Sequence, residues 1–257
     1  MHDPAKDISL ISMILLYLFS GALIAFTEIL KLNMLKEFLI SLFRMSIQLF
    51  LGSIILLYIF KINTLWIVMA FFVLMSIVAS ITIIKKSKIK KGSFIYINVF
   101  VVTLLVTFIF QFFIIQHNLW YDARYFITIA GMIMGNSMNA SALALERFKN
   151  EITENYDLVK TFLSFGANDF EAISLFFRKS LKASLIPIIT NMSSIGIVFF
   201  PGMMTGQILA GSDPTIAVKY QIAIMIMISI SVLITTFLNL FFLMKNLFKY
   251  GIIKNEL

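Results

Sequence analysis

Residues 62–84 read INTLWIVMAFFVLMSIVASITII, and residues 85–91 read KKSKIKK. The first stretch has no charged residue and, as a helix, is long enough to cross a hydrocarbon core of about 30 Å. Five lysines follow directly behind it. An uncharged span followed at once by a basic loop is typical of a membrane helix that ends in the cytoplasm.

The composition of the whole chain agrees with this interpretation. Of 257 residues, 60% are hydrophobic and 13% are charged, and the mean hydropathy is +0.95. Soluble domains carry about 45–50% apolar and about 25% charged residues. We therefore expect lipid to surround most of the chain, and we expect residues 1–257 to form one transmembrane domain.

Seven segments are apolar and long enough to span a bilayer. Helix is the expected state, because lipid offers no partner for a bare backbone group and the alternation of barrel strands is absent. The sequence predicts an all-α, polytopic membrane protein of about seven transmembrane helices, at residues 8–30, 38–60, 62–84, 94–115, 126–145, 183–200 and 221–244.

The basic residues predict the orientation. With the N-terminus outside and the C-terminus cytoplasmic, 16 of the 21 Lys and Arg fall on the inner side and 4 on the outer side, with Arg44 inside a span. Cytoplasmic loops carry such an excess, and an even number of spans would remove it. The net charge of +8 therefore reflects membrane topology and not nucleic-acid binding.

Residues that would support catalysis are scarce. The chain has no cysteine, and its two histidines, His2 and His117, lie far apart. Phosphate-loop, dinucleotide-binding and HExxH zinc motifs are absent from the sequence. We expect no enzyme activity and no cofactor bound by this chain, and no metal ligands are assigned.

Residues 146–182 are highly charged but keep an apolar stripe, with Leu158, Phe162 and Phe165 at helical spacing. Gly166 suits a left-handed residue after a helix end. Asn168 can cap a following helix, with Glu171 completing a capping box. The sequence predicts two helices joined by a sharp cytoplasmic turn. They either lie on the lipid surface or act as a lever for a cytoplasmic partner.

Small and polar residues concentrate in the predicted fifth and sixth spans. Gly131-xxx-Gly135, and Gly202-xxx-Gly206 after the sixth span, predict close helix packing. The polar residues of these spans either bond helix to helix or line a passage, and we favour a passage because they cluster in consecutive spans. They include Asn136, Ser137, Asn139, Ser141, Thr190 and Asn191.

Two further groups belong to the same hypothesis. Residues 201–207 read PGMMTGQ, in which Met203, Met204 and Gln207 offer thioether and oxygen ligands, although most of the 15 Met are expected to face lipid. Glu28 lies near the inner end of the first span. In the second span, Arg44 and Gln48 share a helix face. Arg44 either reaches the cytoplasm or pairs with an acidic residue, Glu28 or Glu37.

The order and spacing of several motifs resemble the FetB family, bacterial ABC-transporter permeases linked to iron export, with relatives in plant aluminium tolerance. The resemblance covers about residues 120–225; Ser141-Ala142 departs from it, where a bulkier residue is expected. The motifs are GMIMGNSMNA (131–140), LSFGA (163–167), Pro187 with Asn191-Met192, PGMMTGQILAG (201–211) and Tyr220-Gln221.

The resemblance implies a multi-pass permease of the bacterial inner membrane. It implies a permease homodimer and a separate cytoplasmic ABC ATPase subunit that binds ATP with Mg²⁺. The segment 146–182 then resembles a coupling element that seats in the ATPase, and transport proceeds by alternating access. The coupling residues are Phe165, Gly166, Ala167, Asn168, Asp169 and Phe170.

The residues alone leave two other functions open. An autonomous channel or secondary transporter would need no ATPase, but it is expected to hold more carboxylates inside the membrane than Glu28. A membrane anchor for a cytoplasmic enzyme would not need polar residues in consecutive spans. The expected substrate pathway consists of Glu28, Gln48, Asn136, Asn139, Asn191, Met203, Met204 and Gln207.

Overall fold

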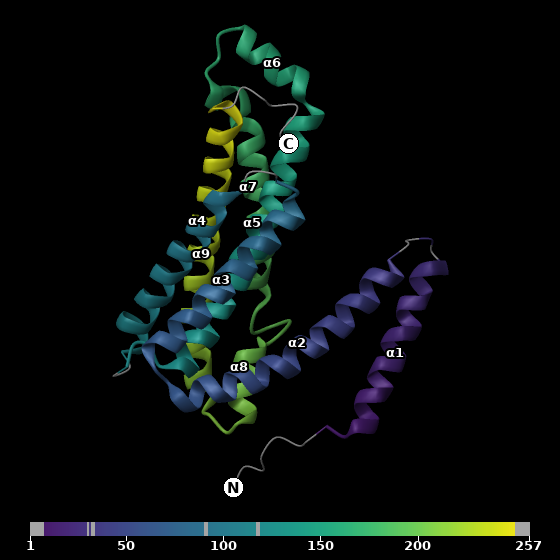
Figure 1. Cartoon of the computed structure of the whole chain (residues 1–257), viewed down its shortest axis with the longest axis vertical. Coiled ribbons are helices and arrows are strands. Elements are labelled where there is room, and N and C mark those ends of the chain that lie inside the picture. The colour runs from purple at the N-terminus through teal and green to yellow at the C-terminus, as the bar shows by residue number, and fades with distance from the viewer. Residues whose placement is uncertain (1–7, 30, 32–33, 90–91, 117–118, 250–257) are drawn as a thin grey trace.

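The computed structural model describes residues 8–29, 31, 34–89, 92–116 and 119–249. Nearly all of the described chain is helical, and most helices run along the long axis of the molecule (Figure 1). The elements are α1 (Leu10–Ile29), α2 (Leu35–Ile62), α3 (Leu65–Ser87), α4 (Ser93–Ile109), the π-helix η1 (Phe110–Ile115), α5 (Ala123–Glu154), α6 (Tyr156–Ser164), α7 (Asp169–Ser194), α8 (Gly202–Leu209) and α9 (Pro214–Lys249).

The centre of the bundle is α5, which packs against α3, α4, α7 and α9. Aromatic rings fill part of this core. Phe72 of α3 meets Phe126 of α5 edge to face at 5.7 Å between centroids, and Phe148 of α5 meets Phe177 of α7 at 6.2 Å. Such pairs add to the burial of apolar surface, which makes α5 the best-packed helix of the chain.

Each of the seven apolar segments expected to span the membrane falls on a helix: α1, α2, α3, α4 with η1, α5, α7 and α9. By length and apolar composition, four described helices qualify as membrane spans: Leu35–Ile62, Leu65–Ser87, Ser93–Ile115 and Pro214–Leu247. The chain is thus an all-α, multi-pass membrane protein. Polar and charged residues lower the apolar content of α5 and α7.

The expected end of the sixth span at residue 200 is wrong. Helix α7 ends at Ser194, and Gly196 takes a φ of +83° that turns the chain. The Gly196 N–H then donates to the Phe199 carbonyl at 2.9 Å. Residues 195–201 therefore form a short connection that leads into α8.

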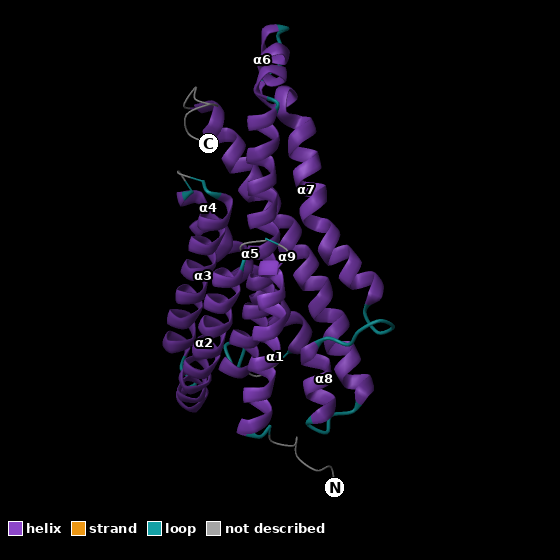
Figure 2. Cartoon of the chain, turned by 90° about the vertical axis from the view of Figure 1, so that its right-hand side faces the viewer, coloured by secondary structure: helices purple, strands orange, loops and turns teal. Residues whose placement is uncertain are grey.

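Helices α1 and α2 form a hairpin that diverges from the rest of the molecule in Figure 1; in Figure 2, which looks from the side of the hairpin, α1 lies in front of the bundle. The Tyr17 hydroxyl of α1 bonds the Ser46 hydroxyl of α2. Ile59, near the end of α2, is its only buried residue within the described side chains, with Leu56 and Phe60 packed beside the core. The hairpin is therefore attached to the bundle at one end of α2.

Asn63 fixes that attachment. It ends α2 with φ +44° and ψ +46°, and its side-chain carbonyl accepts from the Ala123 N–H at 2.8 Å. Its amide also lies 3.4 Å from the Asp122 carboxylate, while Asp122 caps α5 by accepting from the Arg124 N–H. One side chain thus terminates α2 and helps to start α5.

Among the four glycines of the two pairs, Gly131 alone approaches another helix closely, so the expected close helix packing is found at one of the four positions. A Cβ on Gly135, Gly202 or Gly206 would meet no atom within 4 Å, and one on Gly131 would lie 3.3 Å from the Met75 Cε. Gly131 and Gly135 line an open apolar groove of about 290 Å³ between α3 and α5. Methionine side chains from both helices form part of its walls.

Candidate functional site: a polar groove between α5 and α7

A cavity of about 250 Å³ lies between α5 and α7, with Val232 of α9 contributing to its lining. Three amides line it: Asn136 and Asn139 from α5, and Asn191 from α7. We call this the polar groove. It unites three of the residues that the sequence assigned to a passage. Asn139 and Asn191 are exposed, whereas Asn136 is half-buried.

Local geometry keeps acceptor oxygens available in the polar groove. The Asn136 amide nitrogen donates to the Met132 carbonyl one turn back at 2.8 Å, which leaves its Oδ1 for another partner. Pro187 lines the same groove inside α7. Because proline has no N–H, the Ala183 carbonyl loses its usual intrahelical donor. The groove therefore presents neutral oxygen ligands in an otherwise apolar setting.

A second cavity of about 210 Å³ shares Asn136, Asn191 and Ile188 with the polar groove and continues it toward α8. Met203 of α8 and Gln221 of α9 line this continuation. Gln221 is 7% exposed, and its Oε1 has no hydrogen-bond partner among the described residues. Gln221 had entered the sequence argument through the family resemblance but not as a pathway residue.

A third cavity, of about 430 Å³ and mostly apolar, adjoins the second through Gln221 and Met225. Met204 lines it and is buried, on the same helix as Met203. The two adjacent methionines thus contribute to different cavities, and a single site using both side chains is not what the geometry offers.

The remaining predicted pathway residues lie elsewhere. Gln207 of α8 has a buried Oε1 without a partner in the described part of the chain, but it lines none of these three cavities. Gln48 lies exposed on α2, on the diverging hairpin. The Glu28 side chain lies outside the described residues. Arg44 is exposed, and the described side chains include no acidic partner for it.

Behind the polar groove, a buried polar network joins α4, α5 and α9. The Asn98 amide donates to the Asn239 carbonyl at 3.1 Å, and the Asn239 amide donates to the Ser141 hydroxyl at 3.2 Å. The Ser137 and Ser231 hydroxyls lie 2.9 Å apart in the same region. Ser137 and Ser141 thus bond helix to helix and do not line the groove. No local pattern in the sequence pairs Asn98 with Asn239.

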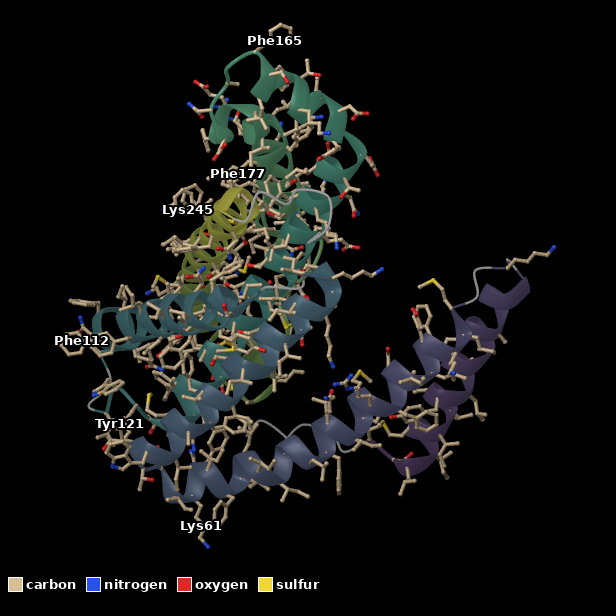
Figure 3. All side chains as sticks on the ribbon, turned by 45° about the horizontal axis from the view of Figure 1, so that its top comes forward. Lys61, Phe112, Tyr121, Phe165, Phe177 and Lys245 are labelled. Carbon is tan, nitrogen blue, oxygen red and sulfur yellow. The ribbon has the colours of Figure 1, made fainter. Side chains whose placement is uncertain are left out.

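The segment 146–182 forms the predicted helix–turn–helix. Gly166 follows α6 with φ +88°, and Asn168 and Glu171 form a complete capping box at the start of α7. We call residues 165–170 the 165–170 turn. Phe165 is 86% exposed and lies at the tip of the molecule, opposite Lys61 (Figure 3). An exposed ring on a capped turn is a suitable anchor for a partner protein.

The base of the helix–turn–helix formed by α6 and α7 is packed against the bundle. The Lys179 ammonium lies 3.7 Å from the Glu151 carboxylate, and Val159 of α6 is fully buried. Lys149 donates to the Lys88 carbonyl at 3.0 Å, which brings the basic end of α3 beside α5. The turn is therefore supported by packed helices and is not a loose loop.

Comparison with known proteins tests the resemblance. Residues 10–248 match the family described as "Uncharacterised protein family (UPF0014)". The chain belongs to the UPF0014 family. The matched range includes every pathway and turn residue named above.

Named relatives in the UPF0014 family come from bacteria and plants. The chain is 43% identical to the "UPF0014 membrane protein slr1647" of Synechocystis over 48% of either chain. It is 34% identical to the "UPF0014 membrane protein YjkA" of Bacillus subtilis, over 76% of this chain and 77% of that protein. It is 32% identical to the "Probable iron export permease protein FetB" of Escherichia coli, over 81% and 82%.

These names describe membrane proteins and a permease, which indicates transport rather than catalysis for the UPF0014 family. No solved structure matches the chain.

Proposed function

We propose that this chain is the membrane-spanning permease subunit of an ATP-driven exporter, with a metal ion, iron first, as its substrate. A separate cytoplasmic ABC ATPase binds and hydrolyses ATP with Mg²⁺, and this chain supplies the passage by alternating access. One observation carries the proposal: α7, which supplies Asn191 to the polar groove, begins at the 165–170 turn, and α5, which supplies Asn136 and Asn139, leads to that turn through α6.

Continuous helix connects the turn with the groove. Asp169 begins α7 and Asn191 lies 22 residues further on, which at 1.5 Å per residue is about 33 Å. Because α7 starts at the turn, a displacement of the 165–170 turn by the ATPase is carried directly to the groove. The capping box and the buried base of the α6–α7 helix–turn–helix support this coupling, since a frayed turn would absorb the movement.

The distribution of charge supports a topology with the 165–170 turn in the cytoplasm. Lys245 lies toward the Phe165 end of the molecule, and Lys61 lies at the opposite end (Figure 3). The hydrogen bond between Lys149 and Lys88 brings two basic segments together at the Phe165 end. We therefore propose seven spans in the bacterial inner membrane, with the N-terminus outside and the C-terminus inside.

The donor set of the groove fits a cargo that must be released. It offers amide oxygens from Asn136, Asn139 and Asn191, with Met203 beside them. Within the described residues there is no cluster of three or more His, Cys, Asp or Glu that could hold a metal tightly. The name of the E. coli relative, a probable iron export permease, makes iron the first substrate to test.

The proposed assembly contains two copies of this chain and its ATPase partners in a lipid bilayer, with no nucleic acid. The test is flux from proteoliposomes that contain this chain and the ABC ATPase encoded with it. We expect iron transport that requires hydrolysable ATP and disappears when the phosphate-loop lysine of the ATPase is replaced. Equal flux from this chain alone, without nucleotide, contradicts the proposal and supports a channel or secondary transporter.

A further inference from the structure

Helix α2 presents a polar face that no described residue of the chain covers. Arg44 and Gln48 are both exposed and lie one turn apart. Ser46 lies two residues from each, so at 3.6 residues per turn it points to the opposite side. Since Ser46 bonds Tyr17 of α1, the face with Arg44 and Gln48 is directed away from α1.

This polar face lies deep within an apolar helix. Gln48 lies 13 residues after Leu35 and 14 residues before Ile62, so each helix end is about 20 Å away. A long arginine can extend toward a membrane surface, but a glutamine at mid-helix cannot. An amide facing lipid at this depth is unfavourable. The structure therefore calls for a protein surface opposite Gln48.

The bundle has an uncovered face of matching character. The polar groove exposes Asn139 of α5 and Asn191 of α7. On the same helix α5, Gly131 and Gly135 line the open groove between α3 and α5, where small residues allow a second backbone to approach closely. Two different observations, exposed amides and an unfilled glycine groove, thus fall on α5.

The polar residues of α2 and those of α5 also lie at similar distances from Asn63, where the two helices are joined. Asn63 joins the end of α2 to the start of α5. Gln48 is 14 residues from Ile62, and Asn136 and Asn139 are 13 and 16 residues from Ala123. The polar positions of α2 and α5 are therefore at roughly equal distances along their helices, about 20 Å.

We infer that α2 of one copy covers the α5–α7 face of a second copy, so that Gln48 and Arg44 complete the polar groove from across the interface. The inference rests on the homodimer of the proposed function and gives that dimer a surface. Two-fold symmetry makes the contact twice, each α2 covering the other copy's groove. The occupant is a second copy because α2 supplies amide and guanidinium donors for the Asn139 and Asn191 oxygens, which accept no side-chain hydrogen bond within the described part of the chain.

Closure of α2 onto its own bundle is disfavoured by its attachment. Helix α2 diverges from the bundle (Figure 1), and only one residue, Thr64, lies between the Asn63 cap and the start of α3. The bonds from Asn63 to Ala123 and Asp122 hold this corner. A rotation of α2 toward its own groove would break them.

The absence of cysteine from the sequence makes the test direct. Gln48→Cys and Asn139→Cys are placed in separate chains with different tags, co-expressed in membranes and treated with a short bifunctional maleimide. We expect a product at about twice the 29.3 kDa chain mass that carries both tags. The matched control is Phe50→Cys with Asn139→Cys, because Phe50 is 68% exposed but lies on the opposite face of α2.

Three results overturn the inference: no product for the Gln48 pair, an equal product for the Phe50 pair, or a link formed only within one chain that carries both cysteines. Iron flux measured on the cysteine-free parent separates the two proposals. ATP-dependent flux without the cross-link refutes this interface alone. A cross-link without ATP-dependent flux refutes the proposed function and leaves the interface in place.

Discussion

Asn168 and Glu171 form reciprocal hydrogen bonds: Asn168 Oδ1 accepts from the Glu171 N–H at 2.9 Å, and Glu171 Oε2 accepts from the Asn168 N–H at 2.8 Å. Replacing Asn168 by Ala removes the cap and is expected to destabilise the protein by about 0.5–2 kcal/mol. Thermal unfolding in detergent measures the loss. Asn168→Asp keeps a capping oxygen and is expected to retain most of the stability; equal losses for both variants contradict this role.

Phe165 is expected to act on the partner and not on the fold. The ring is 86% exposed, so Phe165→Ala should change the free energy of unfolding by less than about 0.5 kcal/mol. Loss of about 1.4 kcal/mol at an interface anchor lowers partner affinity about tenfold. Pull-down of the ATPase and ATP-dependent flux check this. The control is Leu175→Ala, because Leu175 is an exposed residue of α7 beyond the turn. An equal loss of ATPase binding in this variant contradicts a specific role for the 165–170 turn.

Gly166 is expected to tolerate no side chain. Its φ is +88°, although the space around a Cβ is open. Gly166→Ala should therefore destabilise the turn through backbone strain alone, by about 1–2 kcal/mol. Gly52 of α2, also in open space but helical, is the control, since Gly52→Ala should be neutral or stabilising. The midpoint of thermal unfolding compares the two, and a neutral Gly166→Ala refutes the strain.

The amides of the polar groove are expected to carry the substrate. Asn136→Leu and Asn191→Leu should each lower ATP-dependent flux about tenfold, the effect of losing about 1.4 kcal/mol of ligand interaction. Binding to the ATPase should not change, because both positions are distant from the 165–170 turn. Asn191→Gln keeps an amide and should retain flux. If both leucine variants transport at the parent rate, the groove is not the passage.

The buried network predicts coupled effects on stability. Asn239→Leu removes the acceptor of the Asn98 amide and the amide donor to the Ser141 hydroxyl, which keeps only its 3.4 Å contact with the Thr236 hydroxyl; the loss should cost about 1–3 kcal/mol. Because Asn98→Leu breaks the same bond, the double variant should lose less than the sum of the two single losses. Unfolding by denaturant in detergent gives the three values, and simple additivity contradicts direct coupling.

Local rules were enough to predict parts of this structure from the sequence. The capping box at Asn168, the left-handed Gly166 and the helix–turn–helix around them depend on residues a few positions apart, and all are confirmed. The seven helical ranges follow from the apolar runs in the same way. The end of α7 at Ser194, six residues before the expected end of the span, was not predicted. The turn at Gly196 lies in an uncharged stretch without a break in hydropathy.

Contacts between distant helices were beyond such rules. Asn98 and Asn239 are 141 positions apart, and no local pattern pairs them. The same limit explains why Ser137 and Ser141 were grouped with Asn136 and Asn139: neighbours on one helix can face different partners. Gly131 and Gly135 were expected to pack closely against another helix, but a small-residue motif does not specify which helix it meets, and only Gly131 has a close neighbour among the described residues.

Pro187 makes α5 and α7, the two helices that line the polar groove, mechanically unequal. Helix α5 has an unbroken run of 32 residues, whereas α7 lacks one intrahelical hydrogen bond at Pro187, one turn before Asn191. A thrust on the turn should therefore move α5 as a rigid rod while α7 flexes at groove depth. In the proposed transport cycle, the distance between Asn136 and Asn191 is therefore expected to change, which would alter how the groove amides hold the cargo without any side chain having to rotate.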